Sequence, residues 1–354
     1  MDSYIHNLPI QPIDEDAAAC ARTRWDAIAK PLGSLGMLED AIVQIAALTG
    51  DSQVSVRPCC AAVLCADNGV VAQGVAQSDP QVSTLIARSV AQGKSSVCRM
   101  AAASNIACVA VDMGLFEPVD EPKMLNLRIA AGTHDFTQGP AMTREQALQA
   151  IRTGVELVGE LAKKGYRLVA TGEMGIGNTT TSTAIACAFT GRDPALLTGR
   201  GAGLSDEGLA RKVGAIRRAL EVNDPNPDDP LDVLAKLGGF DIAGMCGMFL
   251  GGAVHRVPIV IDGFISTVAA YCATQLREDC KVAMLASHLS AEPAAAVLLD
   301  RMGLQPMLHA NMRLGEGTGA ICLAPLLDMA LSLYSTGPTY ADFGIAAGAG
   351  KTQA

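Results

Sequence analysis

The segment Arg167-Leu-Val-Ala-Thr-Gly-Glu-Met-Gly-Ile-Gly-Asn-Thr-Thr180 indicates the fold class of the chain. Its first four residues predict a buried strand, the glycines that follow predict a tight loop, and the pattern over Thr179–Thr190 predicts a helix. A strand, a glycine loop and a helix in this order form the unit from which parallel sheets are built. In such sheets ligands bind beyond the carboxyl ends of the strands, so we expect the functional site at this loop.

The glycine loop has the composition of an anion site. Glycines let backbone N–H groups turn toward one point, and the N-terminus of the following helix adds positive potential. The spacing from Gly172 to Gly177 is that of a phosphate-binding P-loop, but Asn178 stands where that loop has lysine. A monophosphate is therefore favoured over a nucleoside triphosphate with Mg²⁺. The alternative is a close-packed turn without a ligand.

The alternation of strand, loop and helix recurs along the chain. Further apolar runs that end in Asp, Asn, Gly or Ser predict strands over Ala61–Cys65, Ile106–Val111, Pro258–Ile261 and Val282–Ala286. Helical patterns cover Pro80–Ala102, Thr143–Lys164, Thr179–Thr190, Ser205–Asn223 and Thr318–Leu333. We therefore predict an α/β fold with a parallel β-sheet flanked by helices and apolar strands buried on both faces.

The first fifty residues are helical and acidic in pattern, without a strand. We expect them to pack with the C-terminal helices as a second, smaller helical domain built from both chain ends. The predicted division is residues 1–50 with part of about 300–354, and residues 51–299 as the parallel-sheet domain.

Composition excludes several classes of function. The 354 residues include 27 Lys+Arg against 36 Asp+Glu, a net charge of −9. An acidic chain without a basic run is a poor polyanion binder, so we expect no nucleic-acid partner and no membrane partner. The 11 cysteines form no C-x-x-C pair, which leaves no zinc-ligand spacing and favours free thiols in a reducing cytoplasm. The segment 1–16 lacks the apolar core of a signal peptide.

Two more glycine clusters carry candidate site residues. Thr198-Gly-Arg-Gly-Ala-Gly-Leu204 precedes the helix that contains Lys212. This cation could complete an anion site, although a lysine taken alone is more often a solvated helix charge. In Arg313-Leu-Gly-Glu-Gly-Thr-Gly319, Glu316 lies between two glycines at a helix start. Glu316 could be a first-turn acid favoured by the helix dipole, or a carboxylate carried into a pocket as a general base.

These motifs together resemble the nicotinate-nucleotide–dimethylbenzimidazole phosphoribosyltransferase family over nearly the whole chain. The resemblance rests on segments in one order: Lys30-Pro-Leu-Gly-Ser-Leu-Gly36, Gly139-Pro-Ala-Met-Thr143, Gly172–Thr180, Gly199–Gly203, Gly238-Gly-Phe-Asp-Ile-Ala243, Asp262-Gly-Phe264 and Arg313–Gly319. It implies transfer of 5-phosphoribose from nicotinate mononucleotide to 5,6-dimethylbenzimidazole in cobalamin nucleotide-loop assembly. It also implies a homodimer that needs no cofactor and no metal.

The resemblance implies roles for particular residues. Glu316 matches the family's general base, which would take a proton from the benzimidazole. Glu173 would lie near the ribose or base, where a carboxylate stabilises positive charge at the anomeric carbon. The donor phosphate would be held by residues in or just after the first two glycine clusters: Gly175, Gly177, Asn178, Thr179, Thr180, Gly201 and Lys212. Ser78 and Leu314 would line the benzimidazole pocket, and Gly315 would be a further substrate-binding residue.

Three other hypotheses remain at this point. The first is the same transfer to another base or to a phenolic acceptor, because the chain departs from the family pattern at Asn68 and His134. The second is a P-loop-like nucleotide kinase, which Asn178 in place of lysine disfavours. The third is a non-catalytic nucleotide-binding regulator, which would keep the glycine loops without needing Glu316.

Overall fold

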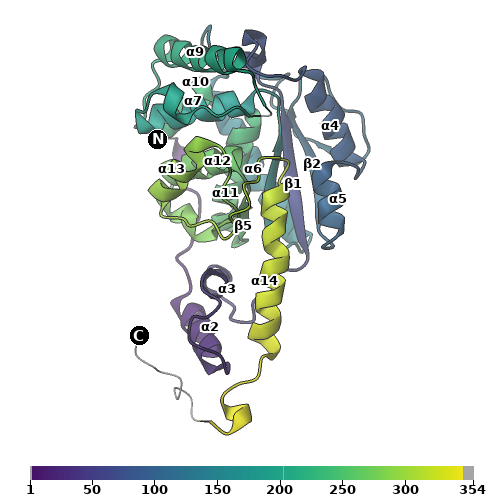
Figure 1. Cartoon of the computed structure of the whole chain (residues 1–354), viewed down its shortest axis with the longest axis vertical. Helices are drawn as coiled ribbons and strands as arrows, with labels where there is room; N and C mark the ends of the chain where they lie inside the picture. The colour runs from purple at the N-terminus through teal and green to yellow at the C-terminus, as the bar shows by residue number, and fades with distance from the viewer. Residues whose placement is uncertain (1, 202, 346–354) are drawn as a thin grey trace.

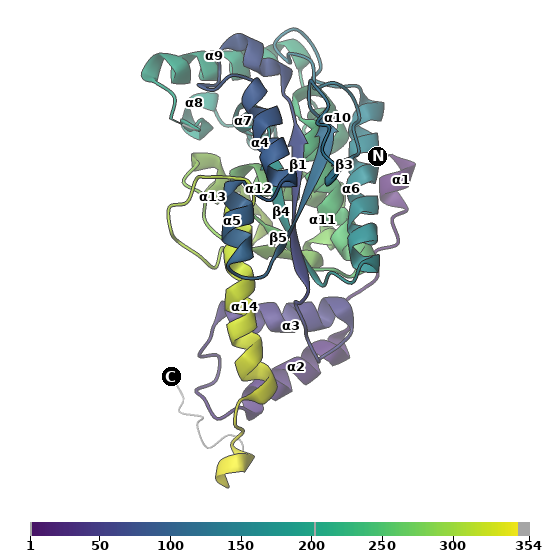
Figure 2. The same ribbon diagram turned by 90° about the vertical axis from the view of Figure 1, so that its right-hand side faces the viewer.

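A parallel six-stranded sheet forms the centre of the molecule. The structure is a computed structural model that describes residues 2–201 and 203–345 (Figures 1 and 2). The strand order is β3-β2-β1-β4-β5-β6, and every neighbouring pair is parallel. The strands are β1 (Cys59–Ala66), β2 (Ala107–Gly114), β3 (Met124–Asn126), β4 (Leu168–Met174), β5 (Ile259–Ile261) and β6 (Met284–Ala286).

Helices connect the strands and cover both faces of the sheet. They are α1 (Ser3–His6), α2 (Glu15–Ala27), α3 (Met37–Thr49), α4 (Gln81–Ala91), α5 (Ser96–Ala102), α6 (Arg144–Lys163), α7 (Asn178–Thr190), α8 (Pro194–Leu197), α9 (Asp206–Asn223), α10 (Pro230–Leu237), α11 (Phe240–His255), α12 (Phe264–Leu276), α13 (Pro293–Met302) and α14 (Thr318–Thr336), with 3₁₀ turns η1 (Gly69–Gln73), η2 (Glu278–Ala283) and η3 (Ala341–Phe343). The predicted α/β fold with a parallel sheet is confirmed.

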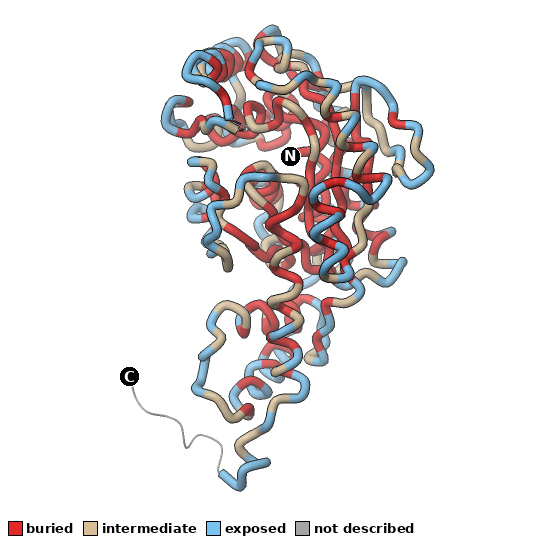
Figure 3. Tube along the Cα trace, turned by 45° about the vertical axis from the view of Figure 1, so that its right-hand side comes forward, coloured by how far each residue is buried: buried red, intermediate tan, exposed pale blue. Residues whose placement is uncertain are grey.

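Strand β1 shows why the sheet needs a helical layer on each side. All eight of its residues are buried, and successive side chains point to opposite faces. Cys60, Ala62 and Leu64 join the core beneath α6, α11 and α12. Val63 and Cys65 join the core beneath α4, α5 and α14. This continuous apolar strand is thus buried on both faces of the sheet, as the sequence predicts, and the buried residues lie at the centre of the molecule (Figure 3).

Strands β1 and β4 lie side by side at the centre, and the chain leaves them in opposite directions. From β1 it continues to β2 and β3, and from β4 to β5 and β6. The connections that follow β1 and β4 therefore diverge and leave a crevice at their carboxyl ends. The glycine loop after β4 lies at this point of the sheet.

Below the sheet, α2 and α3 pack on each other, and α3 packs on the lower part of α14 (Figure 1). Trp25 is buried there against Tyr334, with ring centroids 5.0 Å apart. Helix α1 lies elsewhere, since the Arg277 guanidinium binds the carbonyls of Ile5 and His6. The proposed division into two domains stays a prediction, and its last residues, 346–354, lie outside the described chain.

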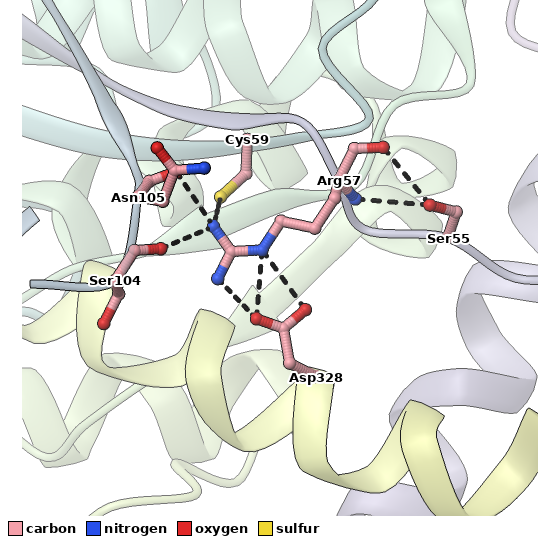
Figure 4. A network of polar contacts seen from close by, with 6 residues as sticks. All are labelled: Ser55, Arg57, Cys59, Ser104, Asn105 and Asp328. Carbon is pink, nitrogen blue, oxygen red and sulfur yellow. Dashed lines mark hydrogen bonds and ion pairs between the residues drawn. The ribbon is translucent and has the colours of Figure 1, made fainter. Parts of the chain in front are cut away.

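Helix α14 is long and apolar enough to cross a membrane by composition, but half of its apolar window is buried inside the structure. The helix contacts β1, β4, β5, α3 and α5. Arg57, just before β1, is tied to it through Asp328 and donates from Nη1 to the carbonyls of Ser104 and Asn105 at 2.9 and 3.2 Å (Figure 4). This network joins α14 to the amino-terminal edge of the sheet.

Candidate active site

A cavity of about 280 Å³ opens at the carboxyl ends of the central strands. Its walls come from six parts of the chain that are distant in sequence: residues 75–78, 173–179, 200, 201 and 204, 262–266, 288, 290 and 292, and 313–316, with one residue of α4. Most of the residues singled out from the sequence line it together: Ser78, Glu173, Gly175, Gly177, Asn178, Thr179, Gly201, Leu314, Gly315 and Glu316. The cavity lies where the parallel-sheet topology places a ligand site.

The glycine loop after β4 is held close to the sheet. A Cβ on Gly175 would lie 2.3 Å from the Ala66 carbonyl oxygen, so only glycine fits there. Gly177 has φ +94°, a left-handed conformation that glycine adopts without strain, and it caps α7. The buried Ser83 hydroxyl accepts a hydrogen bond from the Ile176 N–H at 3.0 Å. These contacts aim the N-terminus of α7 at the cavity.

Lys212 lies directly behind this loop and is fully buried. Its ammonium donates to Thr179 Oγ1 at 3.0 Å and to the Gly199 carbonyl at 3.2 Å. Burial lowers its pKa to about 8, although nearby Glu292 acts in the opposite direction. Within the described chain Lys212 forms no ion pair. A negatively charged ligand at Thr179 would stabilise the charged ammonium and raise this pKa again.

Two predicted phosphate residues have their side chains elsewhere. Thr180 is completely buried and does not line the cavity. The Asn178 amide donates to Glu173 Oε2 at 2.5 Å and to Asp241 Oδ2 at 2.9 Å, so it bridges two buried carboxylates. Burial raises the pKa of Glu173 to about 8 and that of Asp241 to about 6. Both carboxyls therefore hold protons more strongly than ordinary acids.

Glu316 stands in a turn of unusual backbone conformation. It has φ +61° between Gly315 and Gly317, which also have positive φ. A Cβ on Gly172 would lie 2.5 Å from the Glu316 carbonyl oxygen, so β4 and this turn are in direct backbone contact. Oε2 of Glu316 accepts from the Val97 N–H at 3.1 Å, and the side chain lines the cavity. Glu316 and the glycine loop after β4 thus line the same cavity.

Asp262, at the end of β5, fixes the Glu316 turn. Its carboxylate accepts from the N–H groups of Gly319 at 2.8 Å, Ala320 at 2.9 Å and Gly317 at 3.2 Å. It thus takes up three donors at the start of α14, which would otherwise be unsatisfied.

Several cavity residues were not singled out from the sequence: Asp262, His288, Glu292 and Arg313. Asp262 and His288 follow β5 and β6 closely, so the rule that ligands bind at strand carboxyl ends could have found them. Asp241, behind the cavity, lies in the first turn of a buried helix and gives no comparable signal.

The two departures from the family pattern do not line the cavity. Asn68 is buried behind the glycine loop, where its Oδ1 accepts from Thr181 Oγ1 at 3.2 Å. His134 is bonded through its backbone to the Ala141 carbonyl. Among the residues that the structure describes, no group of three His, Cys, Asp or Glu side chains could hold a metal ion.

Comparison with known proteins agrees with this geometry. Residues 10–345 match a family model described as "Phosphoribosyltransferase". A nicotinate-nucleotide–dimethylbenzimidazole phosphoribosyltransferase from Ruminiclostridium cellulolyticum is 42% identical over 333 residues, which cover 94% of this chain and 95% of the relative. The chain belongs to this phosphoribosyltransferase family. A protein of the same name from Chloroflexus aggregans is 42% identical over 337 residues, 95% of this chain and 96% of its own.

A solved structure shares the family fold over the whole molecule. CobT from Thermus thermophilus has a TM-score of 0.88 at 36% identity, and the match covers 94% of this chain and 100% of that one. The phosphoribosyltransferase family is thus supported by both sequence and structure.

Proposed function

We propose that the chain transfers 5-phosphoribose from nicotinate mononucleotide to 5,6-dimethylbenzimidazole and releases nicotinate and α-ribazole 5′-phosphate. The observation that carries this proposal is that Glu316 and the α7 glycine loop line one cavity. The relatives' printed name supplies the two substrates. The same transfer to another base or a phenolic acceptor is the alternative, because the half-buried Ser78 and the exposed Leu314 would contact the acceptor at the cavity wall.

The donor phosphate would occupy the end of the cavity near Gly177, Thr179 and Gly201. Backbone N–H groups at the start of α7 and the Lys212 ammonium behind Thr179 supply positive potential there. Because the Asn178 amide is bonded to two carboxylates, we assign it to the support of Glu173 rather than to the phosphate.

Glu173 would face the ribose and its cationic base. In the free protein its pKa of about 8 keeps it protonated at neutral pH. A bound pyridinium ring would lower that pKa by charge attraction and leave a carboxylate beside the anomeric carbon. That carboxylate would stabilise the positive charge that develops as the bond to nicotinate lengthens.

In the transfer itself, one benzimidazole nitrogen attacks C1′ of the ribose. The C1′–N bond to nicotinate breaks, and its electron pair neutralises the departing pyridinium. The other benzimidazole nitrogen loses its proton to Glu316. Attack on the face opposite the leaving group converts the β-glycosidic bond to α, and the cavity contributes mainly by holding both rings in line.

The test is to mix the purified protein with nicotinate mononucleotide and a panel of bases, and to measure released nicotinate and α-linked products by chromatography. We expect α-ribazole 5′-phosphate with dimethylbenzimidazole, and a large loss of kcat in Glu316→Gln with both substrates still bound. Without product from any base, the proposed function is wrong. Near-normal turnover in Glu316→Gln would remove Glu316 as the base.

We also propose that the protein acts as a homodimer in the cytoplasm. Leu85 on α4 and Leu314 at the cavity rim are 58% and 55% exposed, and a second copy would cover such apolar side chains. Sedimentation velocity over a range of concentrations should show a dimer, and a monomer throughout would contradict it. Cell fractionation should find the protein in the cytoplasmic fraction.

A further inference from the structure

The charge balance of the cavity raises a question about the donor. Four acidic side chains line it: Asp262, Glu292, Glu316 and Glu173, of which Glu173 is protonated in the free protein at neutral pH. Nicotinate carries a carboxylate on its ring, both in the mononucleotide and after release. An uncompensated carboxylate in this lining would be repelled, so binding of an acidic ring requires a cation that is free to pair with it.

Two arginines line the cavity, and only one of them is available. Arg200 donates to the Leu204 carbonyl at 2.9 Å and to Asp206 at 2.5 Å, so its guanidinium is already occupied. Within the part of the chain that the structure describes, Arg313 has neither a side-chain hydrogen bond nor an ion pair. Lys212 is behind Thr179, at the proposed phosphate end.

Arg313 also has a suitable position. The Ala291 N–H donates to the Met312 carbonyl at 3.3 Å, which places Arg313 beside the segment that carries Glu292. Glu292 in turn accepts from the Gly201 N–H at 3.1 Å, at the proposed phosphate end. Glu316, three residues after Arg313, lies at the acceptor end, because it is the proposed base for the benzimidazole. Arg313 therefore stands on the wall between phosphate and acceptor, where the base of a bound donor has to lie.

We propose that Arg313 binds the nicotinate carboxylate and so makes the enzyme selective for nicotinate over nicotinamide mononucleotide. This inference rests on the proposed function and deepens it. A guanidinium presents two parallel N–H groups that match both oxygens of a carboxylate, whereas a carboxamide offers a single acceptor oxygen and no charge. Arg313 is exposed, so its guanidinium is accessible to an entering ring.

The experiment compares two donors that differ in one group. We expect kcat/KM of Arg313→Gln for nicotinate mononucleotide to fall about 10- to 100-fold, the value of a charged hydrogen bond. With nicotinamide mononucleotide the same variant should be nearly unchanged. Arg313→Lys, which keeps the charge but loses the fork, should show an intermediate loss. Arg99→Gln removes an exposed arginine of α5 that does not line the cavity, and should leave the donor ratio unaltered.

A binding measurement separates recognition from turnover. Calorimetry with free nicotinate should show weaker binding to Arg313→Gln than to the wild type, with the melting temperature unchanged. If Arg313→Gln loses activity equally with both donors, or keeps the wild-type ratio, the inference is overturned while the proposed function stands. If the wild type transfers phosphoribose from neither donor, the proposed function itself has failed.

Discussion

The buried ammonium of Lys212 gives a prediction in which stability and binding change in opposite directions. Burial lowers its pKa from 10.5 to about 8, and this difference corresponds to about 3 kcal/mol against the charged form. At neutral pH the folded protein therefore carries an unfavourable charge in the absence of ligand. In Lys212→Met this charge is gone, but Thr179 Oγ1 and the Gly199 carbonyl each lose a donor, which costs about 1–3 kcal/mol per group.

The pH dependence distinguishes these two effects. Above pH 10.5 the lysine is neutral in both folded and unfolded states, so the wild type has its full stability. As the pH falls toward 8, the unfolded lysine gains a proton that the folded one does not, and the wild type loses about 3 kcal/mol. Below pH 8 both states are protonated and the loss is complete. Lys212→Met lacks this loss, so it should gain about 3 kcal/mol relative to the wild type between pH 10.5 and 8.

Urea denaturation of both proteins at several pH values measures this difference directly, because titrations common to both cancel. The KM for nicotinate mononucleotide should meanwhile rise about 10- to 100-fold in Lys212→Met, since the positive charge that acts on the phosphate from behind Thr179 is lost. Wild-type binding above pH 8 should take up a proton, detectable by calorimetry in buffers of different ionisation enthalpy. A stability difference that is independent of pH would refute the reasoning.

Three further variants test separate parts of the site. Asp262→Ala leaves three N–H groups at the start of α14 without an acceptor, so the free energy of unfolding should fall by about 2–4 kcal/mol, and kcat should fall as well. If the variant unfolds at lower urea concentration but keeps the wild-type kcat, Asp262 does not position Glu316. In Glu173→Gln the rise of kcat/KM as pH increases toward 8 should disappear; an unchanged pH profile would exclude Glu173. In Asp328→Ala the free energy of unfolding should fall by about 1 kcal/mol, because the partly exposed ion pair with Arg57 is lost, and kcat should not change. A large loss of kcat would contradict a purely structural role for Asp328.

The sheet could be predicted because its strands are continuous apolar runs. All five predicted strands are present, but β3 spans three residues at the sheet edge and has no such run. The helix predicted over Pro80–Ala102 is interrupted: Gly93 has φ +71°, and the Ser95 hydroxyl accepts from the Cys98 N–H to begin a new helix. The apolar period continues across this break, so periodicity alone does not reveal it.

The site was predictable where a local motif carries it. The glycine clusters and Glu316 are contiguous in sequence, and their spacing is characteristic. Lys212 could be named but its complete burial could not, because a lysine on an amphipathic helix is ordinarily solvated. Asp241 reaches Asn178 from a helix 63 residues away, and such a contact depends on the packed fold alone.

Hydrogen-bond donors are distributed unequally among the carboxylates of the cavity, and this separates their roles. Asp262 receives three backbone N–H groups and is fixed in place. Glu173 receives the Asn178 amide and is held within the wall. Glu316 receives one N–H, from Val97, on Oε2, and in the described chain its Oε1 has no partner. A general base needs a free lone pair directed at the substrate, together with one contact that sets its orientation. Glu292 meets both conditions too, because it accepts one N–H from Gly201 and its Oε2 has no partner in the described chain, but it lies at the proposed phosphate end. At the acceptor end Glu316 is the acid that meets both conditions, and a variant at Val97 that shifts this N–H should therefore alter kcat more than either KM.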